Sequence, residues 1–131
     1  MIDIEENPQP IGQLCLQLQA MPRDTNAEGA IYSGWLVSQM DLAAAMLARR
    51  ATRGRVATVS MDSMAFMVPV NVGDCLSVYG NVTDRGRSSL TIKIEVWKPS
   101  HEDEDELCKV TDGSIVLVAI DERGRTRSIN P

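Results

Sequence analysis

The chain has 131 residues, of which 44% are hydrophobic and 24% are charged, and its formal net charge is -5. This length fits a single domain over residues 1–131 with a core of its own, and the acidic balance argues against non-specific nucleic-acid binding, which needs a basic surface. No apolar run approaches the roughly 20 residues that a membrane helix needs, so no membrane association is expected.

The amino-terminal residues 1–8 have neither the basic start nor the apolar stretch of a secretory signal. Cys15, Cys75 and Cys108 are isolated and odd in number, so we interpret them as reduced core cysteines of a cytoplasmic protein. The single histidine, His101, lies in an acidic run typical of an exposed loop. This position argues against a histidine triad or a zinc site, and we expect no metal and no separate cofactor.

The first predicted elements are a strand and a loop. Leucines and an isoleucine alternate loosely with glutamines over residues 11–18, which predicts a strand. Residues 22–29 are rich in Pro, Asp, Asn and Gly, which predicts an ordered loop.

One long helix is predicted over residues 35–50, which contain mostly good helix formers and neither Gly nor Pro. Arginines at its carboxyl end suit the helix dipole, and Gly54 is expected to end it. After Gly54 the hydrophobic period changes to two. This period predicts strands over 56–68, 76–83, 90–97 and 110–120, with turns at 71–74, 84–87 and 122–125.

This order predicts an α+β fold in which a curved antiparallel sheet wraps around the helix. The short turns make the later strands antiparallel. One helix cannot cover both faces of such a sheet, so an uncovered face or edge is expected to meet another subunit.

Asp41 stands out within the helix because its neighbours one turn away are small and mostly apolar. A carboxylate on a buried-facing stripe is costly unless it is paired or hydrogen-bonded, and such groups concentrate at functional sites. Alternatively, Asp41 lies at the edge of the stripe or bonds to the backbone. At the start of the same helix, unpaired N–H groups beside Gly34 have the character of an oxyanion hole, although every helix has such an end.

These residues belong to a longer pattern. Its two most specific parts are Asp24-Thr25-Asn26-x-x-Gly29 and Ser38-Gln39-Met40-Asp41, within residues 21–41, and further matches lie at 54–59, 64–66, 69–74, 86–89 and 95–97. The pattern closely resembles that of the YciA-type acyl-CoA thioesterases, in the acyl-CoA hydrolase branch of the hotdog proteins, over nearly the whole chain from residue 14 to 129. Ser33 replaces a usual glycine and Tyr32 a common phenylalanine, which leaves acyl-chain preference open.

The resemblance implies a hotdog fold and hydrolysis of acyl-CoA to a free acid and CoA at a site on a dimer interface. In that arrangement Asp41 is the general base or the nucleophile, and Asn26 of the facing subunit positions water or the thioester. The Gly34 N–H polarises the carbonyl, and homodimers assemble further into hexamers as trimers of dimers. For Asn26 the alternative is a turn residue that bonds its own backbone.

For the CoA part of the substrate, the candidates are Arg87, Ser88 and Ser89, whose guanidinium, hydroxyls and N–H groups suit phosphate. Arg55 is a further phosphate candidate. The alternative for residues 87–89 is a plain hairpin turn. Met64 and Phe66 are candidates for the acyl or pantetheine path, with core packing as the alternative.

Two other functions remain open at this stage. One is a non-catalytic acyl-CoA-binding hotdog protein, because a fold alone does not fix function. The other is a hotdog dehydratase, which typically relies on a histidine, and His101 is poorly placed for that role.

Overall fold

The computed structural model describes residues 8–129, so the predicted absence of a secretory signal falls largely outside the described residues. The elements follow the predicted order of strand, loop, helix and four strands. Their bounds are β1 Gln13–Gln19, the 3-10 turn η1 Pro22–Asp24, α1 Ser33–Thr52, β2 Val56–Phe66, β3 Cys75–Arg85, β4 Ser89–Pro99 and β5 Leu107–Ala119.

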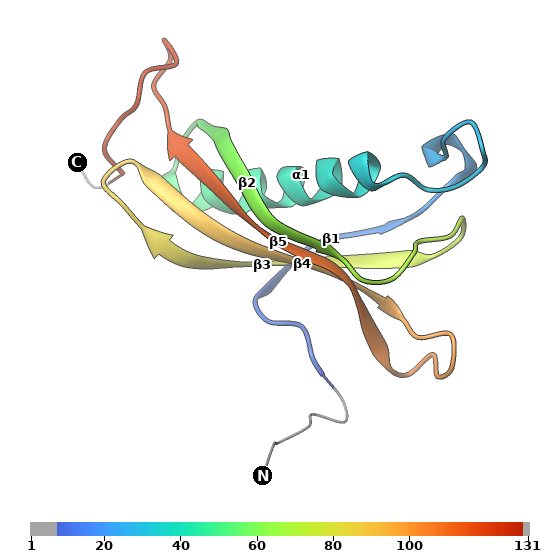
Figure 1. Ribbon diagram of the computed structural model, residues 1–131. Helices are drawn as coiled ribbons and strands as arrows, with labels where there is room; N and C mark the ends of the chain where they lie inside the picture. Colours follow the sequence, from blue (N-terminus) through green and yellow to red (C-terminus); the bar gives the residue numbers. More distant parts are fainter. Residues whose placement is uncertain (1–7, 130–131) are drawn as a thin grey trace.

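The five strands form one sheet in the order β1-β3-β4-β5-β2, and every neighbouring pair is antiparallel. The sheet curves around α1, which lies along its concave side (Figure 1). This arrangement confirms the predicted α+β hotdog fold. The edge strands are β1 and β2, so each presents one unpaired side within the described protomer.

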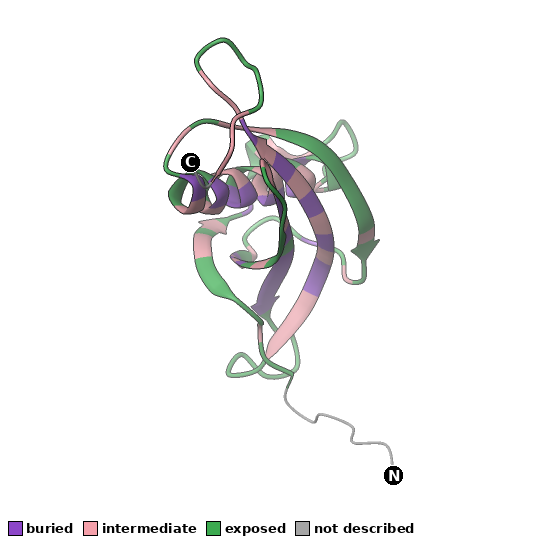
Figure 2. Ribbon diagram, turned by 90° about the vertical axis from the view of Figure 1, so that its left-hand side faces the viewer, coloured by how far each residue is buried: buried purple, intermediate pink, exposed green. Residues whose placement is uncertain are grey.

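The core lies between α1 and the central strands, and exposed positions follow the outer strands (Figure 2). The predicted alternation in β4 is confirmed, because its apolar positions are buried: Leu90, Ile92, Ile94 and Val96. The helix packs against them with its own buried face: Leu36, Met40, Ala43, Ala44 and Ala48. Small alanines on this face let the helix backbone lie close to the sheet.

The helix is longer than predicted, and its end differs from the expectation. Arg53, rather than Gly54, adopts the left-handed conformation (φ 56°), and its N–H bonds to the Arg49 carbonyl. A glycine at position 54 has another explanation. A Cβ there would lie 2.5 Å from Nη2 of Arg127, so Gly54 makes room for that guanidinium.

Two further expectations need correction. The predicted turn 84–87 begins too early: Arg85 pairs with Leu90 as part of β3, and the connection covers residues 86–88. All three cysteines are free, but Cys75 is exposed and is not a core residue. Its neighbour Leu76 points into the core, and successive side chains of a strand point to opposite faces. Over residues 8–129, no helix has the length and apolar character needed to cross a membrane.

Candidate active site

The carboxylate of Asp41 is held by one strong hydrogen bond. Thr58 donates from Oγ1 to Asp41 Oδ1 over 2.6 Å, which links α1 to the edge strand β2. The sequence predicted a paired carboxylate or a backbone bond, and the partner is a side-chain hydroxyl 17 residues away. Among the described residues Oδ1 has this partner, and Oδ2 has no hydrogen-bond partner.

The small-residue face around Asp41 is only partly buried, contrary to the prediction, because Ala44 and Ala48 lie in the core and the other positions do not. Gly34 and Ser38 are exposed, and Val37 and Asp41 are half-buried. Asp41 lies where this face meets β2, at the edge of the buried face. The alternative that Asp41 lies at the edge of the buried stripe is therefore confirmed.

The start of α1 carries free backbone donors. The N-cap residue is Tyr32, and no side chain caps the helix, whereas Ser, Thr, Asp or Asn usually fills this role. The Trp35 N–H bonds to the Tyr32 carbonyl over 3.1 Å. The Gly34 N–H has no acceptor among the described residues. A Cβ at Gly34 would lie 3.3 Å from the Tyr32 ring, so the aromatic ring lies close to Gly34 at the start of the helix.

Asn26 performs the turn role that was its alternative, and its other end remains free. Its Oδ1 accepts hydrogen bonds from the N–H groups of Glu28 (2.9 Å) and Ala30 (3.1 Å), and its own N–H bonds to the Ala30 carbonyl. Two N–H donors can only face the oxygen, so this network fixes the orientation of the amide. The Nδ2 group has no hydrogen-bond partner among the described residues.

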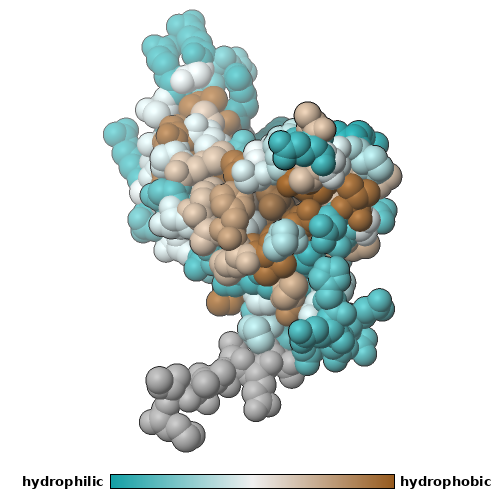
Figure 3. All heavy atoms as spheres, turned by 45° about the vertical axis from the view of Figure 1, so that its right-hand side comes forward, coloured by the Kyte–Doolittle hydropathy of each residue, from teal (hydrophilic) through white to brown (hydrophobic). Residues whose placement is uncertain are grey.

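The described protomer does not join Asn26 to Asp41 by any hydrogen bond. The edge that carries Thr58 is also unusually apolar for a surface, with Val59, Met61 and Phe66 between 37% and 56% exposed. Apolar side chains gather on the surface of the face drawn in Figure 3. An open strand edge with exposed apolar residues is typical of an interface between subunits.

The phosphate candidates come together at the opposite end of the helix. At the end of β5, the Ala119 N–H bonds to the Ser88 carbonyl (2.7 Å) and the Ile120 N–H bonds to the Arg55 carbonyl (3.0 Å). Arg55 and Ser88 therefore flank one strand, at a separation of about 10 Å, which is two strand spacings. Ser89 begins β4, and its Oγ covers Gly86 within the turn.

This end is also rich in arginine, and we name it the basic end. Nine of the 13 Lys and Arg residues of the chain belong to the carboxyl end of α1, the β3–β4 connection and the segment after β5: Arg49, Arg50, Arg53, Arg55, Arg85, Arg87, Arg123, Arg125 and Arg127. Figure 1 shows these three regions at one end of the molecule. The loop 100–106, which carries five acidic residues, joins β4 to β5 at the other end. Basic residues of this acidic protein are therefore concentrated at one end, and the acidic loop 100–106 lies at the other.

Met64 and Phe66 have different surroundings. Ser63 adopts a left-handed conformation (φ 54°) where the register between Asp62 and Ala65 shifts. Half-buried Met64 consequently lies over Gly113 and against the core. Phe66 is 49% exposed at the end of β2. Core packing thus largely explains the position of the Met64 side chain, but it does not explain the position of the exposed Phe66 side chain.

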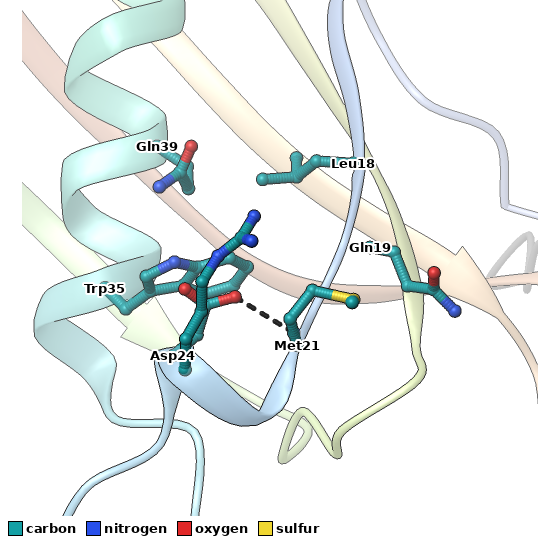
Figure 4. A pocket seen from close by; sticks show the side chains of 7 residues that line it. Leu18, Gln19, Met21, Asp24, Trp35 and Gln39 are labelled. Atoms are coloured by element: carbon teal, nitrogen blue, oxygen red, sulfur yellow. Dashed lines mark hydrogen bonds between the residues drawn. The ribbon is translucent and has the colours of Figure 1, made fainter.

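A cavity of about 430 Å³ lies beside the motif loop, on the other side of α1 (Figure 4). It is lined by Leu18, Gln19, Met21, Arg23, Asp24, Trp35 and Gln39. The carboxylate of Asp24 accepts a hydrogen bond from the Met21 N–H over 2.9 Å. The cavity contains none of the predicted site residues. Over residues 8–129, no cluster of three or more His, Cys, Asp or Glu is placed to hold a metal.

Comparison with known proteins places these features in context. Residues 28–104 match the family described as Thioesterase superfamily. The acyl-CoA thioester hydrolase YciA of Escherichia coli is 43% identical over 122 residues, which are 92% of this chain and 92% of that protein.

Solved structures agree with this match. A hexameric broad specificity acyl-coenzyme A thioesterase is 45% identical with a TM-score of 0.88, over 95% of this chain and 85% of that one. A second structure of that enzyme has an aspartate replaced by alanine. The acyl-CoA hydrolase of Staphylococcus aureus, solved with coenzyme A and with an asparagine replaced by alanine, is 25% identical with a TM-score of 0.79, over 86% of this chain and 67% of that one.

Proposed function

The chain belongs to the thioesterase superfamily and is an acyl-CoA thioester hydrolase, and we propose that Asp41, Asn26 and the Gly34 N–H carry out its reaction. The observation that carries this proposal is the half-buried Asp41 carboxylate, fixed by Thr58 within the matched motif. The products are a free carboxylic acid and CoA.

Asp41 acts as the general base. Thr58 occupies Oδ1, which leaves Oδ2 to accept a proton from water. The water oxygen then attacks the thioester carbonyl, the C–S bond breaks, and the thiolate of CoA takes up the proton. Direct attack by Asp41 is the alternative. Label in the Asp41 carboxylate after single-turnover hydrolysis in ¹⁸O-water would demonstrate direct attack, because general-base catalysis introduces the water oxygen only into the product acid.

The oxyanion that develops on the carbonyl needs hydrogen-bond donors that are already oriented. Over residues 8–129, the Gly34 N–H is free at an uncapped helix end, and Nδ2 of Asn26 has no hydrogen-bond partner. Both groups are donors. This supports a role for Asn26 on the thioester oxygen, in preference to a role as an acceptor for water.

The complete site is formed by two copies of the chain. Asp41 and Asn26 have no direct bond within a protomer, and the apolar β2 edge next to Thr58 is open. A two-fold dimer across this edge would bring the Asn26 loop of one subunit to Asp41 of its partner. We further propose a trimer of such dimers, supported by the hexameric relatives.

The CoA moiety binds at the basic end, with Arg55, Arg87, Ser88 and Ser89 holding its phosphates. The support is their convergence around the end of β5 and the excess of arginine there. The acyl or pantetheine chain passes Phe66 and Met64. The free cysteines and an acyl-CoA substrate favour a cytoplasmic location.

The direct test is thiol release from a panel of acyl-CoAs of different chain length. Hydrolysis of at least one of them is expected. Tight binding of acyl-CoA without release of CoA would instead support the non-catalytic binding protein. The dehydratase alternative has no support, because His101 lies in the exposed acidic loop.

A further inference from the structure

The segment that follows β5, residues 121–129, is tied to both sides of the basic end. It turns back through a hydrogen bond from the Asp121 N–H to the Arg125 carbonyl (2.7 Å). It then bonds through the Arg127 N–H to the Ala119 carbonyl (3.0 Å), and through the Ile129 N–H to the Arg87 carbonyl (2.8 Å). We name residues 121–129 the C-terminal latch.

The side chain of Arg127 is the centre of this latch. Its Nε donates to the Ile120 carbonyl (2.9 Å), and its Nη1 donates to the Thr52 carbonyl (3.2 Å). Its Nη2 reaches both Oγ1 of Thr52 and the Arg55 carbonyl, each at 3.3 Å. One half-buried guanidinium therefore joins the end of α1, the residue before β2 and the end of β5.

Arg127 is engaged with protein oxygens, in contrast to its neighbours. Within residues 8–129, the guanidinium groups of Arg49, Arg53, Arg85 and Arg87 have no hydrogen bond or ion pair. Arg55 uses one nitrogen, Nη1, on the Glu122 carbonyl (3.1 Å), so the latch contacts its side chain as well as its backbone. The basic end thus contains arginines that are free for an anion and one arginine, Arg127, whose three guanidinium nitrogens all donate to protein oxygens.

We propose that Arg127 is a positioning residue for the CoA phosphates, and that the C-terminal latch sets the separation and orientation of Arg55 and Arg87. This inference rests on the proposed function of the basic end. The latch bonds to the backbone of both residues, so its loss frees both arginines to move. Arginine is required because its planar fork reaches several carbonyls at once, which the single ammonium of lysine does not.

Gly54 provides an independent way to disturb the same contact. A Cβ at this position would lie 2.5 Å from Nη2 and 3.0 Å from Cζ of Arg127, so alanine displaces the guanidinium. The backbone of Gly54 has no positive φ, and alanine is therefore compatible with its conformation.

The test compares an acyl-CoA with the matching acyl-pantetheine, which lacks the nucleotide and its phosphates, as substrates of Arg127→Lys and Gly54→Ala. For both variants we expect KM for acyl-CoA to rise about 5- to 10-fold with kcat nearly unchanged, the signature of lost uniform binding. KM for acyl-pantetheine should not change. Arg125→Lys is the matched control, because the exposed Arg125 side chain has only a 3.9 Å ion pair with Asp121, and the substitution keeps the charge and the backbone bonds of the latch. It should behave as wild type.

The outcomes separate the inference from the function on which it rests. A wild type that hydrolyses neither thioester contradicts the proposed function. Equal KM values of the wild type for the two substrates would mean that the phosphates do not contribute to binding. Arg127 would then have no phosphate contact to position, and the inference would be wrong. If the wild type prefers acyl-CoA but KM of the variants rises equally for the two substrates, then Arg127 is merely structural and the inference is wrong. The same conclusion follows if the variants only have a lower unfolding temperature.

Discussion

Thr58 donates a hydrogen bond of 2.6 Å to Asp41, from the edge strand β2 to the side of the helix. This contact selects one oxygen of the carboxylate and leaves the other without a hydrogen-bond partner among residues 8–129. A hydrogen bond to a charged group contributes more than one between neutral groups, so Thr58 fixes the direction in which Asp41 accepts a proton.

Removing the Thr58 hydroxyl should therefore impair the base. Loss of a hydrogen bond to a charged group corresponds to about 1.5–3 kcal/mol, or about a 10- to 100-fold fall in kcat for Thr58→Val, which keeps the side-chain shape. Thr58→Ser keeps the hydroxyl and is the control. Steady-state kinetics of the two variants measure the difference, and equal kcat values would rule out the role of Thr58.

Asn26→Asp separates the two roles of Asn26. Aspartate keeps an oxygen for the Glu28 and Ala30 N–H groups, so the loop should remain folded. It removes the Nδ2 donor, and loss of an oxyanion donor typically lowers kcat about 100- to 1,000-fold. The measurement is kcat together with the unfolding temperature. Full activity in Asn26→Asp would mean that Asn26 is only a turn residue.

The phosphate contacts should appear in the salt dependence of binding. We expect KM for acyl-CoA to rise with ionic strength, because exposed charges are screened. Arg87→Ala should raise KM roughly 3- to 10-fold at low salt, the range for an exposed charged contact. Arg23→Ala, at the other end of the molecule, is the control. A KM that is insensitive to both salt and Arg87 would contradict the proposed CoA site.

Mixing two inactive variants tests whether the site is shared. In a dimer of Asp41→Ala with Asn26→Ala, one site has both wild-type residues and the other has neither. Random reassociation of equal amounts makes half of the dimers mixed, so about one quarter of wild-type activity should return. The assay is activity after joint unfolding and refolding, with each variant refolded alone as control. No recovery would place both residues in one subunit.

The sequence was sufficient to predict the long helix, the order of strands and the motif around Asp41. These features depend on local periodicity and on short spacings. The partner of Asp41 was not predictable, because Thr58 has only the ordinary pattern of a strand residue and the contact depends on how β2 returns along α1. Residue 41 was also assigned to a buried stripe, since the helical period locates a face but not the direction in which the sheet lies.

The basic end illustrates the same limit. Arg55 and the segment 87–88 were separate candidates in the sequence, and the chain at the end of β5 brings them together through bonds from Ile120 to Arg55 and from Ala119 to Ser88. Gly54 had the usual signature of a helix stop, whereas its small size serves Arg127, 73 positions later. Such long-range contacts leave no local pattern.

The most direct test of the central claim is the rate of thiol release by Asp41→Asn, measured on an acyl-CoA that the wild type hydrolyses. Asparagine retains the size of the side chain and an acceptor for Thr58 but cannot accept a proton from water. We predict a fall in kcat of about 100- to 10,000-fold, the usual contribution of a general base, with little change in KM or in unfolding temperature. A kcat within a few-fold of wild type would contradict the assignment of Asp41 as the catalytic base.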